Sequence, residues 1–239
     1  MSWPPAVARV HLPRVDSTSA EATRRDPPVW VLADAQDAAR GRRGRAWSTQ
    51  PGNFAVSLAY RPPGTTADFA RRSFVASLAL ADALDGFGVT GVALKWPNDV
   101  LVDGAKVAGI LLEVPRPGLL VVGIGVNLAA APEAAPDATA PPGHLDGIAV
   151  PSAFLDRLAP AYAAWDARLV AHGFDPVRTA WLARAARRGR RIVARLTDRT
   201  LTGTFDGIDA DGHLRLGPPD GPATIPAADV FFPRGVPCC

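Results

Sequence analysis

The sequence predicts an α+β protein: a mixed or antiparallel sheet with helices, followed by a small all-β barrel. Two observations support this prediction. Over residues 1–186, short alternating or apolar runs typical of strands are interspersed with longer stretches typical of helices. From residue 187 onward, short strand-like runs are separated by Gly and Asp turns, which indicates a barrel or sandwich of about 50 residues. We therefore expect two domains, 1–186 and 187–239.

The elements of the first domain follow from their local patterns. A helix is expected to start within residues 15–25, where Asp16 and Ser17 are good cap residues and Thr18 and Glu21 have the spacing of a capping box. The other elements are expected in this order: strands at 29–35 and 53–61, a helix at 67–88 closed by Gly86 or Gly88, strands at 92–96, 99–102, 105–114 and 119–128, and helices at 152–172 and 176–186.

Three further signals refine this order. Asp-Gly at 103–104 separates two strand-like runs and predicts a hairpin turn. Residues 129–150 are rich in Ala and Pro and predict a long loop. Pro160 predicts a kink or a break in the helix at 152–172, because proline removes a helical hydrogen bond.

The composition excludes several classes of protein. Lys and Arg exceed Asp and Glu by 26 − 23 = 3, which is too little for a broad nucleic-acid-binding face. The two cysteines, Cys238 and Cys239, exclude a disulfide framework. No apolar run has the length of a signal peptide or a membrane span, so a soluble, cytoplasmic protein is expected. Phosphate-loop, zinc-ligand and nucleophile-elbow motifs are absent, which argues against covalent serine or cysteine catalysis.

The segment 39–47, "ARGRRGRAW", which we call the arginine loop, holds four arginines in six positions. Guanidinium groups bind carboxylates and phosphates through paired donors, and the two glycines allow the backbone to approach a ligand closely. Trp47 adds an aromatic surface. The loop could hold an anionic small molecule, grip a nucleic-acid backbone or merely keep a surface soluble. Because the arginines repel one another, we expect it to be mobile when empty.

A second motif, "KWPNDVLVDGAKVAGILLE" at 95–113, places Asn98 and Asp99 at a strand end. By simple alternation, Lys106 would share a strand face with Ala108, Ile110 and Leu112. An ammonium at the head of an apolar face either extends its charged end to water or meets an anion.

A third motif, "VVGIGVNL" at 121–128, places Gly123, Gly125 and Asn127 on one strand face. Small residues there would let a flat group lie against the sheet. Together the three motifs suggest a site where cations bring a carboxylate and a triphosphate together beside a pocket for a base. Such a reaction needs positioning and charge stabilisation more than a nucleophile.

The three motifs, in this order, resemble those of biotin protein ligases, and the resemblance extends over nearly the whole chain. "DSTSAEA" at 16–22 resembles the family's Asp-Ser-Thr-Asn start, with Ser19 in place of Asn, and Ala39 replaces the first glycine of the loop motif. The resemblance implies a class II synthetase-like biotin/lipoate ligase domain followed by a Src-homology-3-like barrel. It also implies the short form, without an N-terminal DNA-binding domain.

The resemblance further implies a two-step reaction. Biotin is activated by ATP with Mg²⁺ to biotinyl-5'-AMP, and the acyl group passes to a lysine of a biotin carboxyl carrier protein. The implied biotin-binding residues are Ser17, Thr18, Ser19, Gln36, Arg40, Gly41, Arg42 and Lys106. The implied nucleotide-binding residues are Arg45, Trp47, Lys95, Asn98 and Asn127. The implied catalytic residues are Lys106, Arg42, Arg40 and Asp99, of which Asp99 would orient the incoming lysine or help to bind the metal.

Three alternatives remain at this point. A lipoate or octanoate ligase would share the catalytic fold. A biotin sensor without catalysis would keep the binding residues. A biotin-sensing regulator that binds nucleic acid would need a DNA-binding domain, which the first fifteen residues are too short to form. We expect neither a nucleic acid nor a membrane as partner, and a weak homodimer is possible.

Overall fold

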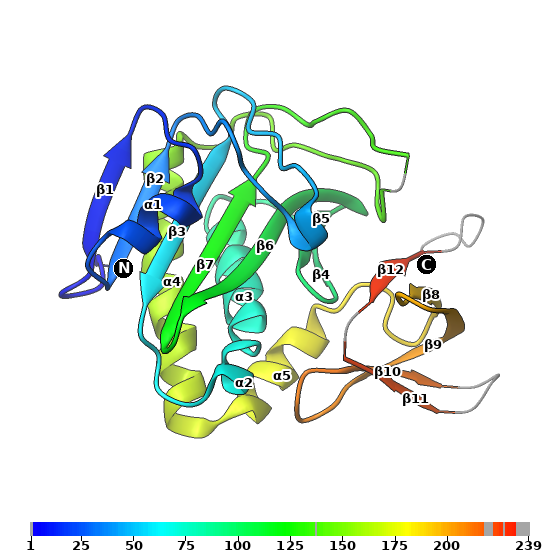
Figure 1. The fold of residues 1–239 in the computed structure, drawn as a ribbon. Coiled ribbons are helices and arrows are strands. Elements are labelled where there is room, and N and C mark those ends of the chain that lie inside the picture. The colour runs from blue at the N-terminus through cyan, green and yellow to red at the C-terminus, as the bar shows by residue number, and fades with distance from the viewer. Residues whose placement is uncertain (1, 137, 218–221, 227, 233–239) are drawn as a thin grey trace.

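The computed structural model describes residues 2–136, 138–217, 222–226 and 228–232. Its larger part is built on a seven-stranded sheet in the order β1-β2-β3-β7-β6-β5-β4, shown in Figure 1. The strands are β1 (Ala8–Leu12), β2 (Val29–Ala33), β3 (Phe54–Tyr60), β4 (Val92–Lys95), β5 (Asp99–Val102), β6 (Ala105–Arg116) and β7 (Leu119–Val126). β1 runs parallel to β2, and the remaining neighbours are antiparallel. The predicted mixed sheet is therefore confirmed.

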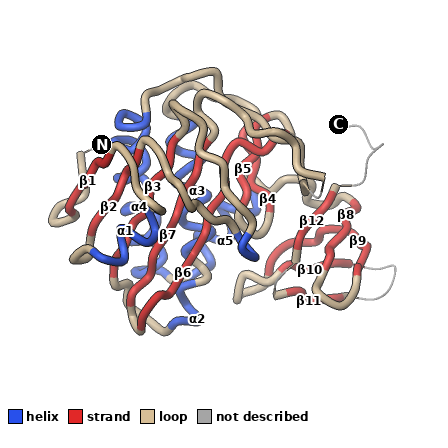
Figure 2. The backbone as a smooth tube through the Cα atoms, turned by 45° about the horizontal axis from the view of Figure 1, so that its top comes forward, coloured by secondary structure: helices blue, strands red, loops and turns tan. Residues whose placement is uncertain are grey.

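Helices cover the two faces of this sheet unequally (Figures 1 and 2). The helices are α1 (Thr18–Arg24), α2 (Thr66–Phe69), α3 (Arg72–Asp85), α4 (Pro151–His172) and α5 (Phe174–Ala183). α3 and α4 pack on one face, where Trp30 and Phe54 are buried with Phe154 of α4. On the other face α1 covers a smaller apolar cluster through Ala22, which leaves the rest of that face open to a site.

The predicted elements of this part are found, with three differences at helices. The capping box suggested by the spacing of Thr18 and Glu21 does not form, because Ser17, one of the two expected cap residues, is the N-cap of α1 and its side chain makes no capping bond. The helix expected at 67–88 is divided into α2, which begins with a capping box of Thr65 and Asp68, and α3, although Ala70 and Arg71 between them keep right-handed helical dihedral angles. α4 continues through Pro160 as one helix, so the predicted break does not occur. Residues around Pro160 are buried, and this packing offsets the missing hydrogen bond.

The Asp-Gly turn is confirmed. Asp103 and Gly104 both have positive φ, at 49° and 82°, as a type I′ hairpin turn requires. The segment expected to be a long loop, 129–150, contains no helix or strand among its described residues. β1 was not expected; its sequence, "ARVHL", is only five residues long, and all of its residues are exposed or partly buried.

The C-terminal part is a five-stranded antiparallel sheet in the order β11-β10-β9-β8-β12. Its strands are β8 (Arg191–Arg195), β9 (Thr200–Ile208), β10 (Leu214–Gly217), β11 (Ala223–Ile225) and β12 (Asp229–Phe231). The predicted all-β character is confirmed, but within the described residues the two edge strands do not pair to close a barrel. Cys238 and Cys239 lie outside the described residues.

The two parts share one apolar core. Trp181 of α5 packs edge-on against Phe205 of β9, and the Trp96 indole N–H donates to the Gly212 carbonyl at 2.9 Å. Buried residues of both sheets belong to the same cluster. The division at residue 187 therefore stays a prediction. No helix in the described part of the chain has the length and apolar character needed to cross a bilayer.

Candidate functional site

A cavity of about 350 Å³ lies on the open face of the large sheet, next to the arginine loop. Residues of the 129–150 loop and of β12 complete its wall. All the residues singled out from the sequence line it: Ser17, Thr18, Ser19, Gln36, Arg40, Gly41, Arg42, Arg45, Trp47, Lys95, Asn98, Asp99, Lys106 and Asn127. The structure thus brings the three motifs together, while the role of each residue stays a prediction.

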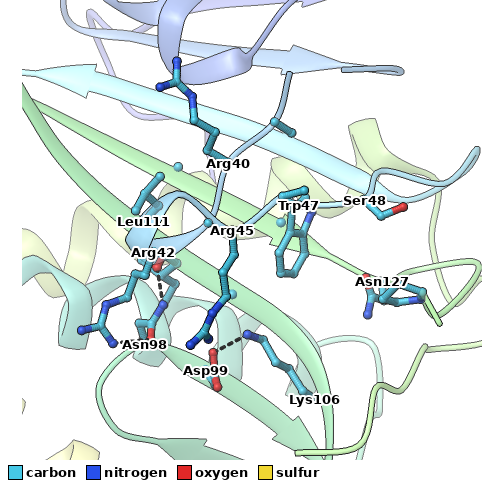
Figure 3. A pocket seen from close by; sticks show the side chains of 18 of the residues that line it. Arg40, Arg42, Arg45, Trp47, Ser48, Asn98, Asp99, Lys106, Leu111 and Asn127 are labelled. Atoms are coloured by element: carbon cyan, nitrogen blue, oxygen red, sulfur yellow. Dashed lines mark hydrogen bonds and ion pairs between the residues drawn. The ribbon is translucent and has the colours of Figure 1, made fainter. Parts of the chain in front are cut away.

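The arginine loop is a tight turn held by its own backbone. The Gly41 N–H donates to the Arg45 carbonyl at 2.7 Å, and the Trp47 N–H donates to the Ala39 carbonyl at 3.0 Å. Arg42 is largely buried, and its guanidinium donates to the Asn98 side-chain oxygen at 3.3 Å (Figure 3). Burial lowers the pKa of Arg42 below its ordinary value, with Asp229 opposing this shift and Arg43 and Arg45 adding to it. Its side chain therefore faces the cavity with few water contacts.

Two loop arginines bind a carboxylate that the sequence did not single out. Arg43 and Arg45 both donate to Oδ2 of Asp229 on β12, at 2.8 and 2.6 Å. These ion pairs offset part of the repulsion among the loop arginines. That repulsion was the reason to expect a mobile loop, and the mobility of the loop stays a prediction. Asp229 is 186 residues from Arg43 in the chain, so no local pattern signals the contact.

A β-bulge determines where Lys106 points. Val100 of β5 pairs with Ala108, but the next residue, Leu101, pairs with Lys106, so Val107 is an extra residue in β6. Val107 and Ala108 are both buried in the core, and the alternation reverses there. The prediction that Lys106 shares a face with Ala108, Ile110 and Leu112 is therefore wrong. Lys106 instead lies beside Gly109, where an added β-carbon would be 3.6 Å from the Lys106 Cε.

Lys95, Asp99 and Lys106 form a buried charge cluster at the base of the cavity. The Lys106 ammonium is 2.6 Å from Oδ1 of Asp99, and the Lys95 ammonium is 3.3 Å from Oδ2. Burial alone would raise the pKa of Asp99, but the two ammoniums outweigh it and hold the pKa below 3.8. Burial lowers the pKa of Lys95, which also donates to the Thr139 hydroxyl at 2.6 Å. Asp99 therefore stays ionised and fixes both lysines.

The glycines of β6 and β7 form a floor under Trp47, as Figure 3 shows for the indole. A β-carbon at Gly125 would lie 2.4–2.5 Å from the ring, and one at Gly109 would lie 2.9 Å from it. The small residues do admit a flat group, as expected, but in this structure that group is the Trp47 side chain of the protein itself. The Lys106 ammonium lies 5.6 Å from the centre of the Trp47 ring, a cation–π arrangement.

Asn127 closes the same face at the far end of β7. It is 3% exposed, and its side-chain N–H donates to the Gly143 carbonyl at 2.8 Å. Its side-chain oxygen has no hydrogen-bond partner within the described part of the chain. Such a buried acceptor beside a cavity is available to a donor on a ligand.

The opposite end of the cavity is polar and uncharged. The Gln36 side-chain oxygen accepts from the Thr18 N–H at 2.8 Å and from its hydroxyl at 3.0 Å. Ser57 of β3 donates to the Thr18 hydroxyl at 2.9 Å and lies 3.2 Å from the Ser19 hydroxyl. Sequence reasoning missed Ser57, since a single serine in a strand carries no distinctive signal. This network fixes hydroxyl and amide groups that can recognise a neutral polar ligand end.

Carboxylates suited to a metal do not converge at this cavity in the described residues. Both oxygens of Asp99 are engaged by lysines, so it is poorly placed as a magnesium ligand. Asp209, Asp211 and His213 do lie within 4.8 Å of one another, but they belong to the turn before β10 and do not line the cavity.

The chain is similar to known proteins over most of its length. Residues 12–128 match the model of the biotin/lipoate A/B protein ligase family, and residues 189–232 match that of the biotin protein ligase C-terminal domain. The biotin–[acetyl-CoA-carboxylase] ligase of Paracoccus denitrificans is 51% identical over 92% of this chain and 99% of the relative. The bifunctional ligase/repressor BirA of Bacillus subtilis is 30% identical over 84% of this chain and 65% of that longer relative.

Solved structures show the same fold. Biotin protein ligase from Aquifex aeolicus in complex with biotin and ATP superposes with a TM-score of 0.82 at 23% identity, covering 95% of this chain and 99% of that one. Biotin protein ligase from Leishmania major in complex with biotinyl-5-AMP gives a TM-score of 0.58 at 23% identity, covering 94% and 100%. Since the Paracoccus relative is matched over nearly its full length, the chain belongs to the biotin protein ligase family.

Proposed function

We propose that this protein is an ATP-dependent ligase that activates biotin as biotinyl-5'-AMP and transfers it to a lysine of a biotin carboxyl carrier protein. One observation carries the proposal: a single cavity joins a neutral polar end, a cluster of arginines and lysines, and an indole over a glycine floor. These parts suit a ureido ring, a carboxylate with phosphates, and a nucleotide base, respectively. The carboxylase ligase of Paracoccus denitrificans, 51% identical, supports the same assignment.

Biotin would bind with its ureido ring against Thr18 and Gln36 and its carboxylate toward Lys106. Thr18 and Gln36 are already fixed by mutual hydrogen bonds, so they need little reorganisation. Ser17, Ser19 and Gly41 also line the cavity. The Arg40 side chain points away from the charge cluster in Figure 3 and has no polar partner among the described residues, so it is available to close over the ligand.

ATP would bind with its base beside Trp47 and Asn127 and its phosphates toward Arg42, Arg45 and Lys95. In the first step a biotin carboxylate oxygen attacks the α-phosphorus, the bond to the β-phosphate oxygen breaks, and pyrophosphate leaves with the electron pair. Lys106 and Arg42 would offset the repulsion between the two anions and stabilise the charge that develops. Mg²⁺, when bound to the phosphates, would supply further neutralisation.

In the second step the carrier lysine attacks the biotinyl carbonyl carbon, AMP leaves, and the attacking amine loses a proton. Asp99 is ionised and next to Lys106, which supports a role in positioning cations near the reacting carbonyl more than in binding metal. The arginine loop and the 129–150 loop border the cavity and would limit access of water to the adenylate.

Biotin-dependent exchange of pyrophosphate into ATP tests the first step without a carrier protein. The purified chain should exchange pyrophosphate with biotin and not with lipoate or octanoate as the control acid. Exchange with lipoate alone would replace the proposal by lipoate-type ligation. Binding of biotin without any exchange would indicate a sensor. A cytoplasmic location and a weak homodimer stay predictions, and sedimentation equilibrium would test the second.

A further inference from the structure

Asp229 has no role of its own in the reaction proposed above, although it binds Arg45, which is placed there toward the phosphates. Asp229 begins β12, and its register opposite Arg195 of β8 fixes its backbone within the C-terminal sheet. Its side chain is 9% exposed, yet it reaches across to Arg43 and Arg45 of the large part. A carboxylate this deeply buried needs compensating donors, and the loop provides them.

The conformation of the arginine loop in turn needs stabilising contacts from outside the loop. Arg43 adopts φ 58° and ψ 28°, a left-handed conformation that is unfavourable for a residue other than glycine. The loop also concentrates four positive charges, which repel one another most strongly when the turn is compact. Neither the strain nor the repulsion is relieved by the loop's own backbone bonds.

Asp229 offsets the cost of both with one oxygen. Because Oδ2 accepts from Arg43 and Arg45 together, it fixes the strained residue and screens two of the four charges. It does so without touching Arg40, whose side chain lies on the other side of the loop in Figure 3. The C-terminal sheet thereby fixes the backbone of Gly41 and Arg42, which line the cavity.

We propose that Asp229 is a positioning residue through which the C-terminal sheet holds the arginine loop in its ligand-ready conformation. The part of the proposal that concerns the order of the loop rests on the geometry alone. Its consequence for catalysis rests on the proposed function: loss of the contact would weaken substrate binding and let the adenylate escape, while the chemical step itself would change little.

Trypsin reports on the loop directly, because it cleaves after arginine. Purified wild type, Asp229→Asn and the control Asp206→Asn would be digested briefly in native buffer, with cleavage sites identified by mass spectrometry. Asp206 is exposed on β9, so its substitution removes the same charge from the same sheet. In Asp229→Asn we expect cleavage within residues 40–45 to be about tenfold faster, from the loss of charge-assisted bonds. Asp206→Asn should match wild type.

Cleavage after Arg188 and Arg190, which are exposed next to β8, separates loop release from general loosening of the sheet. If cleavage there rises as much as in the loop, Asp229 is merely structural and the proposal is wrong. Equal loop cleavage in wild type and Asp229→Asn also overturns it. Should Asp229→Asn fail to fold, Arg43→Gln breaks one of the two bonds from the loop side. Faster amide exchange over residues 39–47 is then expected, and unchanged exchange refutes the proposal.

Steady-state kinetics tests the consequence. For Asp229→Asn we expect the KM values for biotin and ATP in pyrophosphate exchange to rise about tenfold, with kcat within about threefold of wild type. AMP release without carrier biotinylation should increase. Asp229→Glu should restore part of the coupling between adenylate formation and carrier biotinylation. A large fall in kcat at unchanged KM would refute a positioning role. Absence of exchange in wild type would refute the proposed function and leave the digestion result standing.

Discussion

Substituting Gly125 by alanine tests whether Trp47 and the glycine floor form the nucleotide side of the cavity. The added methyl group would lie 2.4–2.5 Å from three atoms of the indole. Normal carbon–carbon contacts lie at about 3.5 Å, so the ring has to retreat by about 1 Å. The strand β7 is paired on both sides, so its backbone has little room to move instead.

The retreat separates Trp47 from both Gly109 and the Lys106 ammonium, which now lies 5.6 Å from the ring centre. A cation–π contact of this kind contributes roughly 1 kcal/mol, so its loss is expected to raise the KM for ATP about fivefold. The assay is pyrophosphate exchange at saturating biotin with varied ATP.

Gly123→Ala on the same strand face is the matched control. Its β-carbon would lie 3.1 Å from the Ser19 hydroxyl and makes no close contact with Trp47. It should therefore raise the KM for biotin more than that for ATP, and thermal melting should show both variants folded. An unchanged KM for ATP in Gly125→Ala, or the same pattern in both variants, would show that Trp47 does not serve the nucleotide.

Three other predictions follow from charges. Lys106→Ala should slow pyrophosphate exchange about 100-fold while Lys106→Arg retains more activity, because the cation offsets repulsion between the reacting anions; equal rates in both variants would contradict this. Asp166→Asn should lower the free energy of unfolding by roughly 3 kcal/mol in urea, because Arg72, whose side chain is 4% exposed, loses its carboxylate at 3.1 Å. The pKa of Asp99 is below 3.8 in the folded protein, so its stabilising contribution is complete above the unfolded pKa of about 3.9 and disappears as the pH falls through the lower value. Urea titrations from pH 5 to 3 would detect this loss, and a loss already complete at pH 5 would contradict it.

Local signals in the sequence predicted most of the large sheet. The Asp-Gly turn works because both residues tolerate positive φ, and the observed angles agree. The three motifs were predicted to form one site, and all of their candidate residues line one cavity. These predictions succeed because each depends on chemistry within a few neighbouring residues.

The failures concern pairing between distant segments. Lys106 points to the cavity because of a bulge at Val107, and a bulge depends on the register of the partner strand, which alternation alone does not reveal. Asp229 lies in a strand of only three residues, whose sequence carries no signal that distinguishes it from other edge strands. The continuity of α4 through Pro160 depends on burial against other elements. Such features follow from tertiary packing, which overrides local preference.

The two buried acids share one arrangement that explains how the cavity stays cationic. Asp99 bridges Lys95 and Lys106, and Asp229 bridges Arg43 and Arg45. In each case one carboxylate fixes two cations, so it orients them without cancelling their combined charge. A second acid at either place would fix the geometry equally well but would weaken the attraction for a carboxylate and a triphosphate. An excess of one cation over each acid thus gives both a rigid site and an electrostatic attraction for two anions that would otherwise repel each other.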